Sequence, residues 1–116
     1  MNSTSERRIV KRTVAFCQVL DLDHNFLGIT FDLTLEGICL SLPNSFSSEI
    51  NFFVILKPTH ADNIPEVIIK VQPIWRKKNH SEYDEIGGKI IQIWPEDIFK
   101  ALLIYYEKGG PCGLIA

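Results

Sequence analysis

The sequence predicts a mainly β protein, a six-stranded antiparallel β-barrel with a C-terminal α-helix. Six short apolar segments, rich in β-branched and aromatic residues, follow one another with connections of hairpin length. After Pro95 the hydrophobic period becomes helical. The chain has 116 residues, 46% of them hydrophobic, which suits one domain with a single core. Several antiparallel strands in so short a chain usually close into a barrel, because closure removes their exposed edges.

Turn residues delimit the predicted strands. The segments expected to be extended are 13–20, 26–33, 37–42, 50–56, 66–77 and 86–93. Pro73 lies inside the fifth segment and predicts an edge or a bulge, because proline donates no ladder hydrogen bond. Gly87 and Gly88 in the sixth segment predict a sharp bend or a close backbone approach. The segment 78–85 is expected to form a polar turn.

The C-terminal part has the signals of one helix. Pro95 suits a first helical turn, and the acidic pair after it is favourable at the positive end of the helix dipole. Apolar side chains then recur at helical spacing, at Ile98, Phe99, Leu102, Leu103, Tyr105 and Tyr106. Lys108 and Gly109 are stop signals. We therefore expect a flexible basic N-terminal arm (1–12), a barrel plus helix (13–108) and a flexible tail (109–116).

The charge of the chain is unevenly distributed. The net charge is −2, whereas residues 1–12 carry +3, so the remainder carries −5. A basic arm on an acidic body argues against general nucleic-acid binding, which favours a broad basic face, and fits a local anion site better.

Other features bear on where the protein acts. The three cysteines have no metal-type spacing, and two of them lie in apolar segments where they are expected to pack as small hydrophobes. Such cysteines indicate a reducing compartment. The N-terminus lacks the apolar core of a signal peptide, and no apolar run approaches the ~20 residues that span a bilayer. We therefore expect a cytoplasmic protein without membrane insertion.

Catalytic and metal motifs are missing from the sequence. His24, His60 and His80 fall in loop signals far apart, and no GxSxG, HExxH or phosphate-binding glycine-rich loop is present. Although catalytic groups can assemble across a fold, we expect a binding protein and not an enzyme, with neither a cofactor nor a metal.

Two polar segments carry the functional signal. The first is RRIVKR (7–12), in which four of six residues are cationic, and the second is DLTLEG (32–37) between two apolar strands. If DLTLEG is extended, Asp32, Thr34 and Glu36 alternate onto one side. By itself the segment favours a polar hairpin turn, with Gly37 supplying an unusual backbone angle.

Together the two segments resemble the PilZ domain family, bacterial receptors for the second messenger cyclic di-GMP. The family signature is RxxxR followed about twenty residues later by (D/N)xSxxG. Residues 8–12 supply the first motif, and residues 32–37 supply the second with threonine in place of serine. The later segments GICL, VQPIWRKK and IGGKIIQI are also similar to the family's strands, so that the resemblance covers residues 6–108.

The resemblance implies a cyclic di-GMP site on the outer face of the barrel. Its implied ligand-binding residues are Arg7, Arg8, Arg12, Asp32, Thr34, Gly37 and Trp75. An arginine can bind a phosphate or the O6/N7 edge of guanine bidentately and can stack on a base. A carboxylate at Asp32 can accept hydrogen bonds from the opposite edge of guanine. Trp75 is either a stacking platform or an ordinary core or edge aromatic. The negative charge of Glu36 is unfavourable near two phosphates unless it points away or pairs with an arginine.

Three functions stay open at this point. The first is a stand-alone cyclic di-GMP receptor that signals to an unidentified effector protein, with motility, pili, exopolysaccharide or virulence as possible outputs. The second is an adaptor of the same fold that binds no nucleotide and acts through protein–protein contacts alone. The third is a barrel that binds single-stranded nucleic acid through the arm and Trp75, which the acidic body disfavours.

Overall fold

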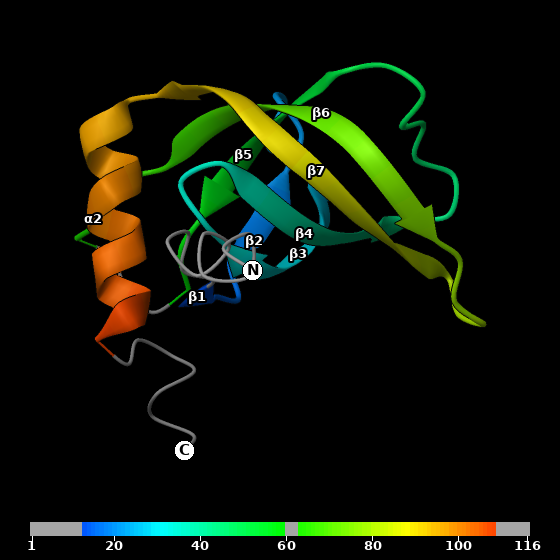
Figure 1. Cartoon of the computed structure of the whole chain (residues 1–116), viewed down its shortest axis with the longest axis horizontal. Coiled ribbons are helices and arrows are strands. Elements are labelled where there is room, and N and C mark those ends of the chain that lie inside the picture. Colours follow the sequence, from blue (N-terminus) through cyan, green and yellow to red (C-terminus); the bar gives the residue numbers. More distant parts are fainter. Residues whose placement is uncertain (1–12, 60–62, 109–116) are drawn as a thin grey trace, which may run out of the picture.

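The computed structural model describes residues 13–59 and 63–108 (Figure 1). All of the predicted elements are present. The strands are β1 (Thr13–Val14), β2 (Gln18–Leu20), β3 (Phe26–Leu33), β4 (Gly37–Pro43), β5 (Phe52–Lys57), β6 (Val67–Lys77) and β7 (Tyr83–Trp94), and they are followed by helix α2 (Glu96–Glu107).

The strands form a closed antiparallel barrel. The sheet order is β1-β3-β2-β5-β6-β7-β4, and an additional pairing of β3 with β4 closes the cycle. Strands β1 and β2 both pair with β3, so together they occupy one strand position of a six-stranded barrel. The predicted mainly β barrel with a C-terminal helix is therefore confirmed.

The predicted first strand, 13–20, is interrupted between β1 and β2. Here the buried side chain of Thr30 takes the place of regular ladder contacts. Its hydroxyl donates to the carbonyl oxygen of Ala15 at 2.5 Å and accepts from the N–H of Cys17 at 2.8 Å. Because a buried backbone polar group needs a partner, this hydroxyl allows the strand to break without an unsatisfied group.

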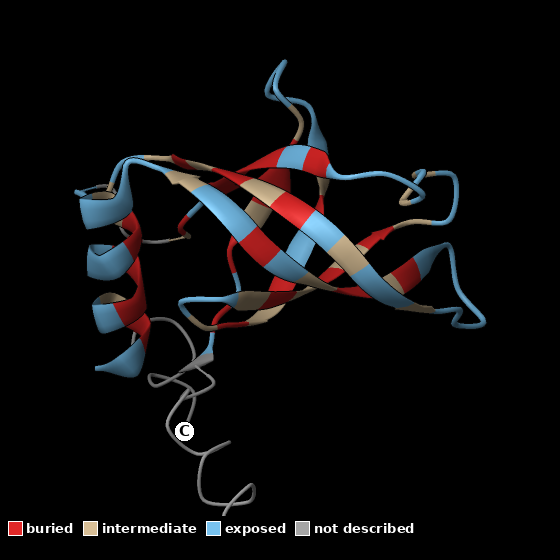
Figure 2. Cartoon of the chain, turned by 45° about the horizontal axis from the view of Figure 1, so that its top comes forward, coloured by how far each residue is buried: buried red, intermediate tan, exposed pale blue. Residues whose placement is uncertain are grey.

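The core fills the barrel and continues beneath the helix. Figure 2 shows buried residues on the side of α2 that faces the barrel and exposed residues on its other side. The buried helix residues are Phe99, Leu102, Leu103 and Tyr106. The Tyr106 hydroxyl donates to the carbonyl oxygen of Phe16 at 3.3 Å and accepts from the Cys17 thiol at 3.4 Å. Burial and the neighbouring Cys17 raise the pKa of Tyr106. This contact fixes the last turn of the helix against the segment between β1 and β2.

The prediction of a polar turn over 78–85 is wrong in its last residues, because β7 begins at Tyr83. Asp84 is fully buried, and its carboxylate accepts from Arg76 Nε at 2.9 Å and from Asn44 Nδ2 at 2.8 Å. The guanidinium of Arg76 also donates to the carbonyl oxygens of Pro43, Asn44 and Phe46. This network joins the β4–β5 loop to the β6–β7 hairpin. It depends on residues distant in the sequence, so the residues of the 78–85 segment alone do not predict it.

Candidate functional site on the outer face of the barrel

Asp32 faces outward because β3 contains a bulge. Thr30 pairs with Leu40 of β4 whereas Asp32 pairs with Cys39, so β3 has one extra residue at this point. Thr30 and Leu33 are both fully buried, which shows that the inward-facing positions change from even to odd numbers across the bulge. In a regular strand Asp32 would share the inward face with Thr30. The bulge instead turns its carboxylate to the outer surface.

A second bulge turns Trp75 outward. Val67, Ile69 and Val71 alternate into the core, and regular pairing would carry this alternation to position 75. The register of β6 against β7 shifts between Pro73 and Trp75, as proline in the strand predicts. Trp75 is 47% exposed. It is therefore not a core aromatic.

The two outward-facing residues lie in one cross-strand row. Asp32 pairs with Cys39 of β4, Cys39 pairs with Gly87 of β7, and Gly87 pairs with Trp75 of β6. Neighbouring strands are about 4.8 Å apart, so the backbones of Asp32 and Trp75 are roughly 14 Å apart across three steps. Residues distant in the sequence thus share one patch of the outer face, and we call this row the Asp32–Trp75 row.

The indole of Trp75 lies directly against the backbone of Gly87. A Cβ atom added at Gly87 would lie 2.1 Å from Cε2 and 2.2 Å from Nε1 of the indole. Only glycine accepts an aromatic ring at this distance, so the predicted close approach at this position is confirmed. One side of the ring is covered by the strand, and a half-exposed indole held in this way can stack on a planar ligand.

The DLTLEG segment forms a tight turn and is not extended beyond Leu33. The Thr34 hydroxyl accepts from the N–H groups of Glu36 and Gly37 at 3.0 and 2.7 Å. The backbone N–H of Thr34 donates to the Gly37 carbonyl at 2.9 Å. The Ile90 N–H donates to the Glu36 carbonyl at 2.7 Å, which joins the turn to β7. Thr34 therefore holds the backbone of the site, and side chains 32, 34 and 36 do not form a continuous row.

Gly37 does not adopt the unusual backbone angle that the turn interpretation predicts. Its φ lies outside the left-handed region, and it begins β4 as a regular strand residue. An added Cβ would meet the Gly88 carbonyl and the Thr34 hydroxyl at 3.5 Å, which is ordinary contact. The fold itself thus tolerates a small side chain at this position.

Lys89 lies on the same outer face and was not singled out by the sequence motifs. Ile86 and Ile90 are buried, so Gly87 and Lys89 point outward from β7. Lys89 is exposed, and its register partners are Gly37 at the start of β4 and Gln72 of β6. The alternation of β7 is the signal that could have placed this cation beside DLTLEG.

The arginines Arg7, Arg8 and Arg12 lie outside the described residues. In the sequence, Arg12 immediately precedes Thr13, the residue that pairs with Leu33 next to Asp32. The described chain therefore begins at Thr13, beside one end of the Asp32–Trp75 row.

This fold resembles that of solved protein structures. The structure of the Bacillus subtilis inhibitor of motility, MotI/DgrA, matches with a TM-score of 0.65 and 20% identity, covering 88% of this chain and 50% of that one. The PilZ domain of Escherichia coli YcgR, solved with c-di-GMP, matches with a TM-score of 0.61 and 18% identity, covering 88% of this chain and 92% of that one. This barrel has the PilZ fold. The resemblance drawn from the two motifs is thus confirmed at the level of the fold.

The PilZ fold accounts for nearly the whole described chain, although the chain spans only half of the MotI/DgrA chain. No protein-family model and no curated protein sequence matches this chain. In the described part of this PilZ fold, no cluster of His, Cys, Asp and Glu could hold a metal ion. None of the helices in residues 13–59 and 63–108 is long and apolar enough to cross a membrane.

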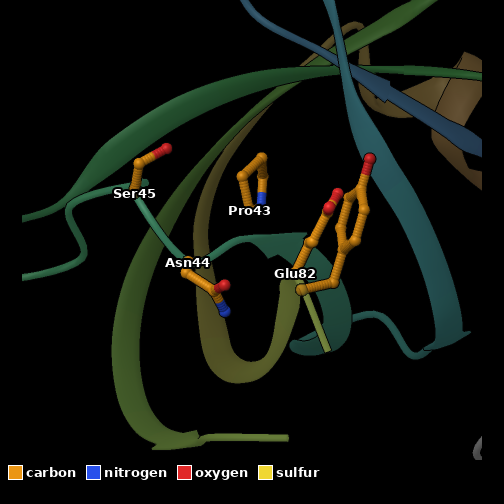
Figure 3. Close-up of a pocket in the computed structure, with 5 residues that line it drawn as sticks. Pro43, Asn44, Ser45 and Glu82 are labelled. Carbon is orange, nitrogen blue, oxygen red and sulfur yellow. The ribbon is translucent and has the colours of Figure 1, made fainter. Parts of the chain in front are cut away.

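A surface pocket lies away from the Asp32–Trp75 row. It is lined by Pro43, Asn44, Ser45, Glu82 and Tyr83, and four of these are labelled in Figure 3. Pro43 ends β4 whereas Gly37 begins it, so the pocket and the DLTLEG turn are at opposite ends of that strand, roughly 20 Å apart. The pocket has one carboxylate and no cation in its lining, and it does not suit a phosphate-bearing ligand.

Proposed function

We propose that this protein is a cyclic di-GMP receptor that transmits the level of the second messenger through contacts with an effector protein. The observation that carries the proposal is the Asp32–Trp75 row, in which two bulges turn a carboxylate and an indole to one outer face. In the sequence, the basic segment RRIVKR directly precedes Thr13, whose backbone pairs with Leu33 next to Asp32. YcgR, whose PilZ domain shares the fold, was solved with c-di-GMP.

The chemistry of the row suits this ligand. Cyclic di-GMP has two guanines and two negatively charged phosphodiesters. In the proposed complex, Arg8 and Arg12 bind phosphate and the O6/N7 edge of guanine, and Arg7 assists them. Asp32 accepts from the N1–H and N2–H₂ donors, and Trp75 stacks on a base. Thr34 contributes by holding the turn, and Gly37 leaves room for the ligand.

Calorimetric titration with cyclic di-GMP tests the proposal. Wild type is expected to bind, and Arg8→Ala, Arg12→Ala and Asp32→Ala are each expected to weaken binding by tenfold or more, since a hydrogen bond to a charged group contributes about 1.5–3 kcal/mol. Glu82→Ala, in the pocket of Figure 3, is the matched control and is expected to bind as wild type. No binding by wild type would refute the receptor function, and unchanged binding in all three site variants would refute the site.

A second candidate is an adaptor that works through protein contacts without nucleotide. A separate exposed aromatic pair favours it. Phe53 of β5 stacks on Trp94 of β7 with ring centroids 5.9 Å apart, and the two residues are 40% and 42% exposed. Lys70 lies over the Phe53 ring at 5.4 Å. A pull-down whose captured proteins are lost with Phe53→Ala, and do not change with added cyclic di-GMP, would favour this function over the receptor.

Neither candidate involves catalysis. A receptor for an intracellular second messenger acts in the cytoplasm. Single-stranded nucleic acid is the disfavoured ligand, because the body of the protein is acidic. A filter-binding assay with labelled single-stranded RNA and DNA at low salt is expected to show no retention. If wild type retains the labelled nucleic acid and Trp75→Ala does not, the protein binds single strands through this indole, and the expectation of no nucleic-acid binding is wrong.

A further inference from the structure

We infer that Lys89 is an additional phosphate-contacting residue of the proposed site, an inference that rests on the proposed function. Neither sequence motif contains this residue. Its placement follows from the register of β7, which pairs it with Gly37 on one side and Gln72 on the other.

The side chain of Lys89 shares the face of the Asp32–Trp75 row. It lies two residues after Gly87 on β7, so the two positions point to the same side and are about 7 Å apart along the strand. Gly87 is the residue that the Trp75 indole covers. Lys89 is therefore a neighbour of the indole-covered Gly87 along β7 and of the DLTLEG turn across β4.

The ammonium group of Lys89 is available to an anion. The side chain is exposed, and no ion pair within the described residues involves it. Across the strand, Gly37 has no side chain to block the approach of a ligand. In the proposed complex one guanine of the ligand stacks on Trp75. The ribose links this guanine to a phosphodiester, which therefore comes within range of the Lys89 ammonium group.

The backbone of Lys89 also lies near that of Glu36, the residue whose negative charge is unfavourable for a phosphate. Glu36 precedes Gly37, the register partner of Lys89, and the Glu36 carbonyl accepts from the N–H of Ile90. Two effects of Lys89 can thus be separated by experiment. The amine can contact the ligand phosphate directly, as we infer, or it can act only by offsetting the charge of Glu36.

The test is a titration of Lys89→Gln, Lys89→Arg and Lys57→Gln with cyclic di-GMP at about 0.05 M and about 0.5 M salt. Lys57 is the matched control, because it is an exposed lysine on β5, which is diametrically opposite β4 in the closed order. Lys89→Gln is expected to raise Kd about tenfold at low salt, a change that corresponds to one charge-assisted hydrogen bond. Lys89→Arg is expected to keep most of the affinity. The difference between wild type and Lys89→Gln is expected to shrink at high salt, where exposed charges are screened.

A double-mutant cycle with Glu36→Gln separates the two effects. Direct contact predicts that Lys89→Gln still weakens binding about tenfold in the Glu36→Gln background. Loss of the effect in that background would overturn the inference, as would equal weakening by Lys57→Gln or unchanged binding in Lys89→Gln. Each of these outcomes leaves the receptor function standing, whereas no binding by wild type refutes the receptor function itself.

Discussion

Replacing Thr34 with valine removes the hydroxyl that holds the DLTLEG turn while keeping the shape of the side chain. Two N–H groups lose their acceptor, those of Glu36 and Gly37 at 3.0 and 2.7 Å. The Glu36 amide is exposed and can bond to water, whereas the Gly37 bond is part-buried. A typical hydrogen bond contributes about 0.5–1.5 kcal/mol net, so the expected loss of unfolding free energy is about 1–2 kcal/mol. For a chain of this size that loss corresponds to a fall in Tm of roughly 4–8 °C.

Urea unfolding followed by tryptophan fluorescence measures this loss, and Thr34→Ser is the control. Serine keeps the hydroxyl, so Thr34→Ser is expected to unfold within about 0.5 kcal/mol of wild type, as most neutral surface substitutions do. If Thr34→Val is as stable as wild type, or if the serine variant is destabilised equally, the hydroxyl does not hold the turn and its hydrogen bonds carry no net stability.

Three further predictions concern the indole, the helix and the buried carboxylate. In Gly87→Ala the new Cβ displaces the Trp75 ring, so the near-UV circular dichroism spectrum should change and cyclic di-GMP should bind more weakly. An unchanged spectrum would argue against the contact between the ring and Gly87. Leu102→Ala, in the buried face of α2, should cost about 2–5 kcal/mol of unfolding free energy in urea, whereas the exposed Ile104→Ala should cost much less. Burial acts to raise the pKa of Asp84, but hydrogen bonds from Arg76 and Asn44 hold that pKa below its usual value. Its stabilising contribution is therefore present at neutral pH and is lost as the pH falls through the folded-state pKa, below about 4. Urea midpoints between neutral and acidic pH should fall more steeply for wild type than for Asp84→Asn, and parallel profiles would contradict the role of this carboxylate.

The local signals in the sequence were sufficient for most of the architecture. The bounds of β3 agree with the predicted segment 26–33, and the helix begins one residue after Pro95. Pro73 marked the bulge in β6, because a proline cannot donate to the ladder. The resemblance of two short motifs to PilZ domains indicated the fold that the solved structures share.

Features that depend on contacts between distant residues could not be predicted from local signals. The break between β1 and β2 depends on the hydroxyl of Thr30, which reaches back to Ala15. The burial of Asp84 depends on Arg76 from the neighbouring strand. The bulge in β3 contains no proline or glycine that would predict it, yet it decides whether Asp32 faces the core or the outer surface. Strand register likewise decides that Lys89 lies beside the turn.

Cyclic di-GMP is expected to bind the outer face formed by β3, β4, β6 and β7. The chemical shifts of the backbone amides and of the indole N–H groups, recorded during titration of the isotopically labelled protein with cyclic di-GMP, test this binding face. The largest changes are expected at Asp32, Gly37, Gly87, Lys89 and the Trp75 indole, with little change at Asn44 and Tyr83. Changes centred on the pocket of Figure 3, or on the Phe53–Trp94 pair, would contradict it.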